Sequence, residues 1–230
     1  MWSGPRNLST AMMRSWENRA DTEVIDEPLY AWYLQATGLD HPGAEHIIEV
    51  GPSSLEDAIG ACLEAPGPTA TISYQKHMAG HLLPGVDRGW LDDLTNCLLL
   101  RDPRRVLASY SKVRETVTLD DIGLPQQVEL APRCRLIIDS ADFLTDPEGY
   151  TRLVCDAVGV DFDPAMLQWP AGTRVSDGVW AEHWYASVEA STTFGPPPDA
   201  AVPGVAPELA SVAAEALEIY RELHAHRSTL

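Results

Sequence analysis

Four short runs rich in β-branched and aliphatic residues recur along the chain, and they constrain its fold more than any other feature. They lie at residues 23–26, 69–73, 97–100 and 135–138, each bounded by segments with helical spacing. Runs of this length without polar alternation are typical of central parallel strands, which are buried on both faces. Strands that alternate with helices predict an α/β fold built on a mainly parallel sheet.

Amphipathic segments between these runs predict the helices that flank the sheet. Residues 11–18, 147–158 and 207–226 repeat apolar side chains three and four positions apart. Ser53 opens a capping box for a further helix that ends near residue 64. Residues 195–207 are rich in proline and predict a loop. No repeat or linker divides the chain, so we expect one domain over residues 1–230.

Charge and composition exclude several classes of partner. The 230 residues carry a formal net charge of −18, which argues against a broad basic face for nucleic acid or an anionic membrane. No apolar stretch approaches the roughly 18–20 residues of a membrane helix, and the start lacks the pattern of a signal peptide. We therefore expect a cytoplasmic protein. The four cysteines are far apart, which predicts reduced thiols rather than disulfides or a zinc site.

The start of the chain holds a candidate anion-binding loop. Gly4 and Pro5 mark a turn, and Ser9 and Thr10 are good N-cap residues for the helix that follows. Backbone N–H groups at such a helix start can cradle an anion, with Arg6 supplying the positive charge. The Gly-Lys-Ser/Thr ending of the ATP/GTP-type loop is absent. A capped helix after a tight turn is the alternative interpretation.

The strand that should precede this loop is nearly missing, since only Met1 and Trp2 remain to form it. Either the first strand is clipped or the true start lies upstream. We expect two residues to hold the loop poorly.

A second anion-binding element follows the run at 97–100. Arg101 comes directly after that run, and Ser109 lies eight positions later on a predicted helix. An arginine at the carboxyl end of a parallel strand occupies the edge where open α/β sheets bind ligands, and its planar fork suits a phosphate. Arg101 could instead cap neighbouring carbonyls beside Asp102.

The two elements together resemble the nucleotide-binding elements of the sulfotransferases. Residues 3–10 resemble the 5′-phosphosulfate loop, and residues 101–109 resemble the 3′-phosphate strand–turn–helix. Residues 24–30 are similar to the acidic Glu-Pro segment of carbohydrate-type members, and Lys76-His77 to a lysine–histidine catalytic element. The resemblance extends from residue 3 to about 194. It departs at Arg6, where many members have lysine, and at residues 177–185, which replace a glycine-rich motif.

The resemblance implies a P-loop-like sulfotransferase fold and sulfuryl transfer from 3′-phosphoadenosine 5′-phosphosulfate (PAPS) to a hydroxyl or amine. Adenosine 3′,5′-bisphosphate (PAP) is then the other product, and no metal is expected. The residues implied to bind the nucleotide are Gly4, Pro5, Arg6, Asn7, Leu8, Ser9, Thr10, Arg101 and Ser109.

Two residues compete for the role of catalytic base. His77 titrates near neutrality and follows a predicted strand, with Lys76 beside it to serve the transferring group. Glu27 also follows a predicted strand, and an apolar cavity would raise its pKa toward working pH. His77 could instead be a structural histidine bonded to backbone, and Glu27 a helix cap. With Arg6 at the leaving phosphate, these are the candidate catalytic residues.

The acceptor is constrained only by two aromatic clusters, at residues 30–33 and 180–185. If they line the site rather than the core, they favour a small apolar or ring-containing molecule. Lysines for a polysulfated glycan are scarce. A nucleotide kinase or hydrolase and a catalytically inactive nucleotide-binding protein stay open as alternatives. The oligomeric state also stays open, and a homodimer is one of the alternatives.

Overall fold

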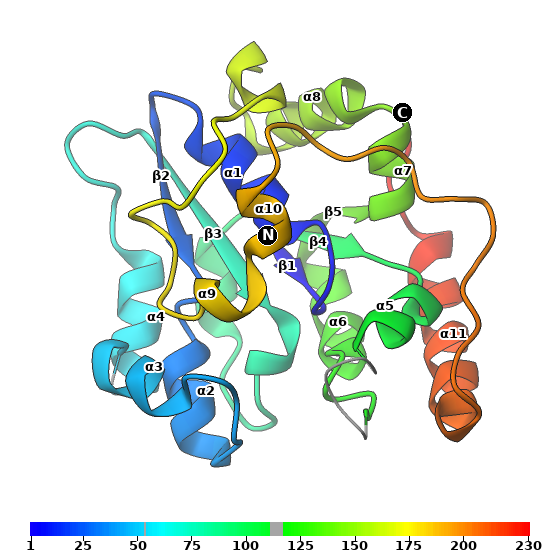
Figure 1. The fold of residues 1–230 in the computed structure, drawn as a ribbon. Helices are drawn as coiled ribbons and strands as arrows, with labels where there is room; N and C mark the ends of the chain where they lie inside the picture. Colours follow the sequence, from blue (N-terminus) through cyan, green and yellow to red (C-terminus); the bar gives the residue numbers. More distant parts are fainter. Residues whose placement is uncertain (53, 111–116) are drawn as a thin grey trace.

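A five-stranded sheet organises the computed structural model, which describes residues 1–52, 54–110 and 117–230 (Figure 1). All neighbouring strands run parallel, in the order β2-β3-β1-β4-β5. The strands are β1 (Trp2–Ser3), β2 (Thr22–Asp26), β3 (Ile72–Met78), β4 (Asn96–Leu100) and β5 (Cys134–Asp139). The predicted α/β class and parallel sheet are confirmed.

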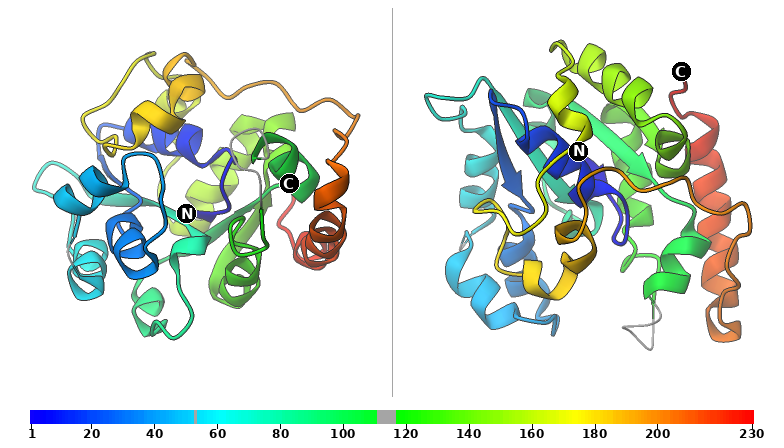
Figure 2. Two further views of the ribbon diagram at one scale, coloured as in Figure 1. Left: turned by 60° about the horizontal axis from the view of Figure 1, so that its bottom comes forward. Right: turned by 45° about the horizontal axis from the view of Figure 1, so that its top comes forward.

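Helices cover both faces of this sheet (Figure 2). They are α1 (Ser9–Glu17), α2 (Tyr30–Thr37), α3 (Ala44–Val50), α4 (Leu55–Leu63), α5 (Pro103–Tyr110), α6 (Leu124–Leu130), α7 (Ser140–Thr145), α8 (Pro147–Val158), α9 (Ala181–Trp184), α10 (Ala186–Glu189) and α11 (Ala210–Ala225). Short 3₁₀ helices include η1 (Ala79–His81) and η2 (Gly89–Asp93). Ser53 lies outside the described residues, and Ser54 caps α4 by accepting from the Asp57 N–H at 3.0 Å. No helix in the described ranges combines the length and apolarity needed to cross a bilayer.

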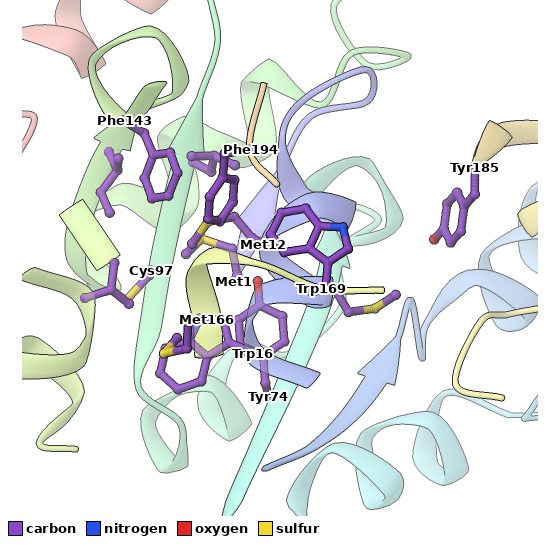
Figure 3. Packing of buried hydrophobic residues seen from close by; sticks show 14 of the residues in the cluster. Met1, Met12, Trp16, Tyr74, Cys97, Phe143, Met166, Trp169, Tyr185 and Phe194 are labelled. Carbon is purple, nitrogen blue, oxygen red and sulfur yellow. The ribbon is translucent and has the colours of Figure 1, made fainter. Parts of the chain in front are cut away.

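Alternation along the strands divides the core into two layers. On β4, Cys97 and Leu99 pack against α1, α7 and α8, whereas Leu98 and Leu100 pack against α4, α6 and α11. Figure 3 shows the first layer, in which Met12 and Trp16 of α1 lie among the aromatic and sulfur-containing side chains. All four cysteines are free thiols. The sheet is thus buried on both faces, as its apolar runs predicted.

The two-residue strand β1 lies in the middle of the sheet, between β3 and β4. Trp2 pairs with His77 on one side and with Leu98 on the other. Its indole donates to the Asn96 side chain at 2.9 Å, and it is 1% exposed. The expectation that two residues would hold the loop poorly is therefore wrong, because pairing on both edges and a buried tryptophan fix this strand.

Strand β3 extends further along the chain than its apolar run indicated. It covers residues 72–78, so Lys76 and His77 lie within the strand and not after it. Successive side chains on a strand point to opposite faces. Lys76 therefore faces the layer of α1, and His77 faces Trp2 and the opposite layer.

Candidate functional site

One large cavity opens at the carboxyl-terminal edge of the sheet and has a volume of about 520 Å³. The chain runs from β1 to β2 and β3 on one side and later to β4 and β5 on the other. Open α/β sheets bind ligands where the strand order reverses in this way. Residues of the predicted loop and strand ends meet here: the loop after β1, Glu27 after β2, and Arg101 after β4 all line the cavity.

The loop after β1 presents the start of α1 to the cavity. Pro5, Arg6, Asn7, Leu8, Ser9 and Thr10 all line it. Leu8 occupies the N-cap position and no side chain caps the helix, so Ser9 and Thr10 are its first residues and not its caps. The reason lies in Asn7, whose side chain accepts from the Leu8 N–H at 2.8 Å and donates to the Leu99 carbonyl at 2.9 Å. The first N–H groups of α1 thus have no side-chain cap, and the residues that carry them line the cavity.

Arg6, Arg101 and Ser109 meet at this end of the cavity. The Arg6 Nε donates to Ser109 Oγ at 3.0 Å, and the Arg101 guanidinium donates to the Arg6 carbonyl. Burial lowers the pKa of Arg101, and the positive charges of Arg105 and Arg6 lower it further. Such a convergence of like charges favours an anionic ligand. Arg6, Arg101 and Ser109, which the sequence indicated as anion-binding residues, therefore lie together in the folded chain.

Gly4 does not line this cavity and serves the loop instead. A Cβ at this position would lie 2.7 Å from the Ile122 carbonyl oxygen, so any side chain would displace the backbone. Gly4 lines a small neighbouring cavity with Ile122 and Gln127. Its function is to let the loop approach the segment before α6 closely.

The other end of the cavity is built on a buried charge cluster around Lys76. Its ammonium donates to Asp26 at 2.9 Å, to Tyr185 Oη at 2.7 Å and to the Glu27 carboxylate. Lys76 is 1% exposed, and Asp26 and Glu27 are each 8% exposed. Burial acts to lower the pKa of Lys76, but Asp26 and Glu27 outweigh it and raise that pKa well above its ordinary value.

Glu27 lines the cavity, and both the burial of its carboxyl group and its backbone conformation are energetically unfavourable. Burial raises the pKa of its carboxyl, Lys76 opposes this shift, and Asp26 adds to it. Two carboxylates share one ammonium here, so one negative charge stays uncompensated. The backbone of Glu27 has φ +42°, and Arg6 at the other end has φ +55°. Within the described ranges these are the only non-glycine residues with positive φ, a strain that clusters at functional sites. Glu27 is not a helix cap, since Leu29 occupies the N-cap of α2.

His77 lies away from this cavity. It is 2% exposed and stacks on Trp2 with ring centroids 4.1 Å apart, and its Nε2 lies 3.1 Å from the Gln75 side chain. Because Lys76 faces the cavity, strand alternation turns its neighbour to the opposite side of the sheet. The predicted reach of His77 to an acceptor is therefore wrong. Within the described residues, no three His, Cys, Asp or Glu side chains are grouped to hold a metal ion.

Aromatic side chains form the rest of the cavity's Lys76 end. Tyr30, Tyr33, Trp184 and Tyr185 line the cavity, whereas Trp180 packs edge-on against Tyr30 and donates to Tyr185 Oη at 3.1 Å. The aromatic clusters thus contribute to both the site and the core. Two lining residues, His41 and His81, were not predicted as site residues. No local pattern in the sequence reveals which histidine faces a cavity.

The late segment at 177–185 is held against the strand ends by a buried ion pair and by hydrogen bonds to Asp26. Asp177 accepts from Arg14 of α1 at 2.7 Å, and Arg14 is 1% exposed. The Gly178 N–H donates to Asp26 at 3.2 Å, and Tyr185 Oη donates to the same carboxylate at 2.7 Å. This segment therefore closes the Lys76 end of the cavity over β2 and β3.

Comparison with known proteins agrees with this geometry. A family model described as a sulfotransferase domain matches residues 1–227. Two proteins of Arabidopsis thaliana, branched-chain-amino-acid aminotransferase-like proteins 1 and 2, are 36% and 33% identical over 202 residues. Each alignment covers 85% of this chain and 36% of the relative, so the chain spans about a third of the length of these curated relatives.

Two solved structures share the fold. The sulfotransferase domain of a Synechococcus olefin synthase superposes with a TM-score of 0.62 at 19% identity, covering 97% of this chain and 92% of that one. The sulfotransferase domain from the curacin biosynthetic pathway gives 0.57 at 15% identity, covering 100% and 97%. With a family model that spans nearly its whole length, this chain belongs to the sulfotransferase domain family.

Proposed function

We propose that this chain transfers a sulfuryl group from PAPS to a hydroxyl or amine of a small, apolar or ring-containing acceptor. One observation carries the proposal: a single cavity has Arg6, Arg101 and an uncapped helix start at one end and a buried carboxylate–lysine cluster with aromatic walls at the other. The first end suits a nucleotide phosphate, and the second suits an organic acceptor and its proton.

The residues at the donor end fit the two phosphate groups of the nucleotide. The backbone N–H groups at the start of α1, with Arg6, would hold the 5′-phosphosulfate and stabilise the negative charge that develops on the leaving phosphate oxygen. Arg101 and Ser109 would hold the 3′-phosphate, Arg101 through charge-assisted hydrogen bonds. The convergence of Arg6, Arg101 and Arg105, with no ion pair from Arg6 or Arg101 to a carboxylate within residues 1–52, 54–110 and 117–230, supports this assignment.

Glu27 is the base in this proposal. As the acceptor oxygen or nitrogen bonds to sulfur, the bond from sulfur to the 5′-phosphate oxygen breaks and its electron pair stays on that phosphate. The acceptor proton passes to the Glu27 carboxylate, whose raised pKa makes it a better base at neutral pH than an exposed glutamate. Lys76 holds Glu27 in place and favours its ionised form, which opposes the effect of burial.

A thermal-unfolding comparison tests the donor assignment. A ligand that binds only the folded protein at a hundred times its Kd stabilises it by about 2.7 kcal/mol. PAP should therefore raise the melting temperature much more than ATP with magnesium does, and Arg101→Ala should remove most of the shift. Arg152→Ala, whose side chain is 52% exposed in a surface ion pair with Glu148, is the matched control. Equal shifts with the two nucleotides would overturn the proposal.

A further inference from the structure

Asp26 and Glu27 are neighbours in the sequence, and both carboxylates bind the same Lys76 ammonium. Asp26 pairs with Lys76 in the register of β2 and β3, so their side chains share one face of the sheet. The next residue of a strand would point to the opposite face. Glu27 instead has φ +42°, which breaks this alternation and brings its carboxylate back to the ammonium. A strained backbone thus builds a site in which two carboxylates share one cation.

The carboxylate of Asp26 is held by three groups and does not reach the cavity. It accepts from Lys76 at 2.9 Å, from Tyr185 Oη at 2.7 Å and from the Gly178 N–H at 3.2 Å, and its side chain is 2% exposed. Glu27 and Lys76 line the cavity, whereas Asp26 does not. Burial raises the pKa of Tyr185 well above its ordinary value, so that hydroxyl stays neutral. Asp26 can therefore act on an acceptor only through Lys76 and Glu27.

The charge balance of this cluster changes when Glu27 takes up a proton. Before that step the two carboxylates exceed the ammonium by one negative charge, and after it Asp26 and Lys76 remain as a matched ion pair. Without Asp26, the same step would leave the Lys76 ammonium buried and unpaired, which is strongly unfavourable. Lys76 alone would therefore make Glu27 a weak base. In agreement with this balance, burial raises the pKa of Glu27, Lys76 lowers it and Asp26 raises it.

Other charged or titratable side chains face the cavity from several elements. They are Arg6, His41, His81, Arg101, Asp120 and Asp121. Burial lowers the pKa of His81 well below its ordinary value, so that ring is neutral, and His41 is hydrogen-bonded to a tyrosine. The two arginines meet at the donor end, and the two aspartates precede α6. Arg14 of α1 is paired with Asp177. Among the described residues, Lys76 is thus the cation bound to Glu27, and Asp26 is the anion that shares it.

We propose that Asp26 is a positioning residue for the transfer reaction: by sharing the Lys76 ammonium, it leaves Glu27 able to take up the acceptor proton. This role rests on the proposed function, in which Glu27 is the base, and deepens it by assigning a residue that the acceptor does not contact. As the acceptor oxygen bonds to sulfur, its proton passes to Glu27, and the electron pair of the breaking sulfur–oxygen bond stays on the 5′-phosphate. Asp26 and Lys76 gain and lose no proton in this step.

The pH dependence of kcat tests this role on the whole chain, with saturating PAPS and with 4-methylphenol as the acceptor. In Asp26→Asn the acid limb of kcat should move to lower pH by about 1–3 units, the effect of one nearby charge in a buried site. About half of this change should appear in the plateau rate as a fall of about 3–30-fold, because a weaker base accepts the proton less readily. At pH values below the wild-type limb the two rates should converge, since the wild-type base is protonated first. Asp26→Glu, which keeps the charge, should retain most of the wild-type profile.

Two further variants separate this role from a structural one. Asp177→Asn also removes a buried carboxylate that holds the late segment, but its partner is Arg14, so the position of the limb should not change. Asp26→Asn/Lys76→Gln removes both charges of the pair, so protonation of Glu27 again leaves no unpaired charge. Its limb should stay within about one pH unit of the wild-type limb. Because this double variant buries no unpaired cation, it also provides the test if Asp26→Asn alone does not fold.

The position of the limb decides between the outcomes. A limb at the same or a higher pH in Asp26→Asn than in the wild type would overturn the role of Asp26, as would an equal downward shift in Asp177→Asn. A displacement of more than about one pH unit in the double variant would overturn it too. A wild type that binds no PAP, or a limb that survives in Glu27→Gln, would instead overturn the proposed function, because Glu27 would not be the base.

Discussion

The two ends of the cavity are built in opposite ways. The donor end uses one continuous segment, residues 5–11, which comprises the loop after β1 and the first turn of α1. Arg101 and Ser109 complete this end, and Arg6 is exposed. The acceptor end joins buried side chains from β2, β3, η1, α2 and the late segment, and Lys76 there is only 1% exposed. Exposed cations and open backbone N–H groups attract an anion from water. A buried and fully paired cation does not, so it serves to hold its neighbours in place.

Because the two ends are built differently, we expect mutations in them to change different quantities, namely nucleotide affinity and the rate of transfer. Substitutions at the donor end should change nucleotide affinity, because in the proposed function those groups contact phosphates in both the bound and the reacting states. Substitutions at Glu27 should change the rate of transfer and leave affinity for PAP intact, because the carboxylate acts only when the acceptor loses its proton. Three predictions test the division and a fourth tests the burial of His77, from the largest expected effect to the smallest.

Glu27→Gln should slow sulfation of 4-methylphenol by PAPS about 10²–10⁴-fold, the usual contribution of a general base. The wild-type rate should fall as the pH drops through the Glu27 pKa, which burial places above its ordinary value of 4.5, because only the ionised carboxylate accepts a proton. The amide cannot titrate, so this acid limb should vanish in the variant. Rates measured with radiolabelled PAPS from pH 5 to 8 provide the check.

Glu49→Gln is the control for this experiment, since its side chain is 79% exposed on α3. Calorimetry with PAP and a melting curve would show that Glu27→Gln still folds and binds. A variant that loses PAP affinity while keeping its rate would break the proposed division between the two ends.

Arg101→Ala should weaken PAP binding by about 1.5–3 kcal/mol, the range for hydrogen bonds to charged groups. Its guanidinium also donates to the Arg6 carbonyl, so the variant loosens the loop as well as removing a charge. The effect should decrease at high salt because it is partly electrostatic. Titration calorimetry at two ionic strengths measures both. Unchanged affinity would place the 3′-phosphate elsewhere in the cavity.

The donor end could be predicted from sequence because its determinants are local. Arg101 and Ser109 are separated by a turn and part of a helix, and a buried strand precedes them. The apolar run, the turn residues and the helical spacing can each be recognised in the sequence. The helix start was misplaced by one or two residues. Asn7 reaches across to the Leu99 carbonyl, and no local pattern reveals a partner 92 positions away.

The acceptor end could be predicted only in part. Polar residues follow the apolar run at 69–73, which predicts that the strand ends there, yet Gln75, Lys76 and His77 are all buried within it. Each is compensated by a distant group: the Cys62 carbonyl, the Asp26 and Glu27 carboxylates, and the Trp2 ring. Because those partners come from other elements, the sequence indicated the right region but assigned the wrong face to His77 and did not predict His81.

His77 should make the fold sensitive to acid. Burial lowers its pKa well below 6.5, and the charge of the chain's amino terminus lowers it further, so the folded ring stays neutral while the unfolded ring gains a proton near pH 6.5. The unfolded state therefore binds more protons below that pH, and stability falls as the pH drops, by up to about 1.4 kcal/mol per pH unit for this group. His81 adds a shift of the same sign.

Denaturant unfolding at pH 7.5, 6.5 and 5.5 measures this dependence. His77→Gln should be less stable at pH 7.5, through lost stacking on Trp2, but should show a shallower decline toward pH 5.5. Parallel declines in the two proteins would mean that His77 titrates normally in the folded state.

Ser109→Ala should have the smallest effect, weakening PAP binding by about 0.5–1.5 kcal/mol, the typical net contribution of a single hydrogen bond. The hydroxyl accepts from Arg6 Nε at 3.0 Å, so its loss frees that guanidinium as well as removing a contact to phosphate. A phosphate contact and an orienting role for Ser109 can be distinguished by whether the binding free energy changes of two single variants add in the double variant. If Ser109 only contacts the phosphate, its effect should add to that of Arg6→Ala, whereas a residue that acts by orienting Arg6 should lose its effect once Arg6 is alanine. Calorimetry on both single variants and the double variant completes this cycle. The same cycle between Ser109→Ala and Glu27→Gln should be additive, and strong coupling between them would contradict the separation of the two ends.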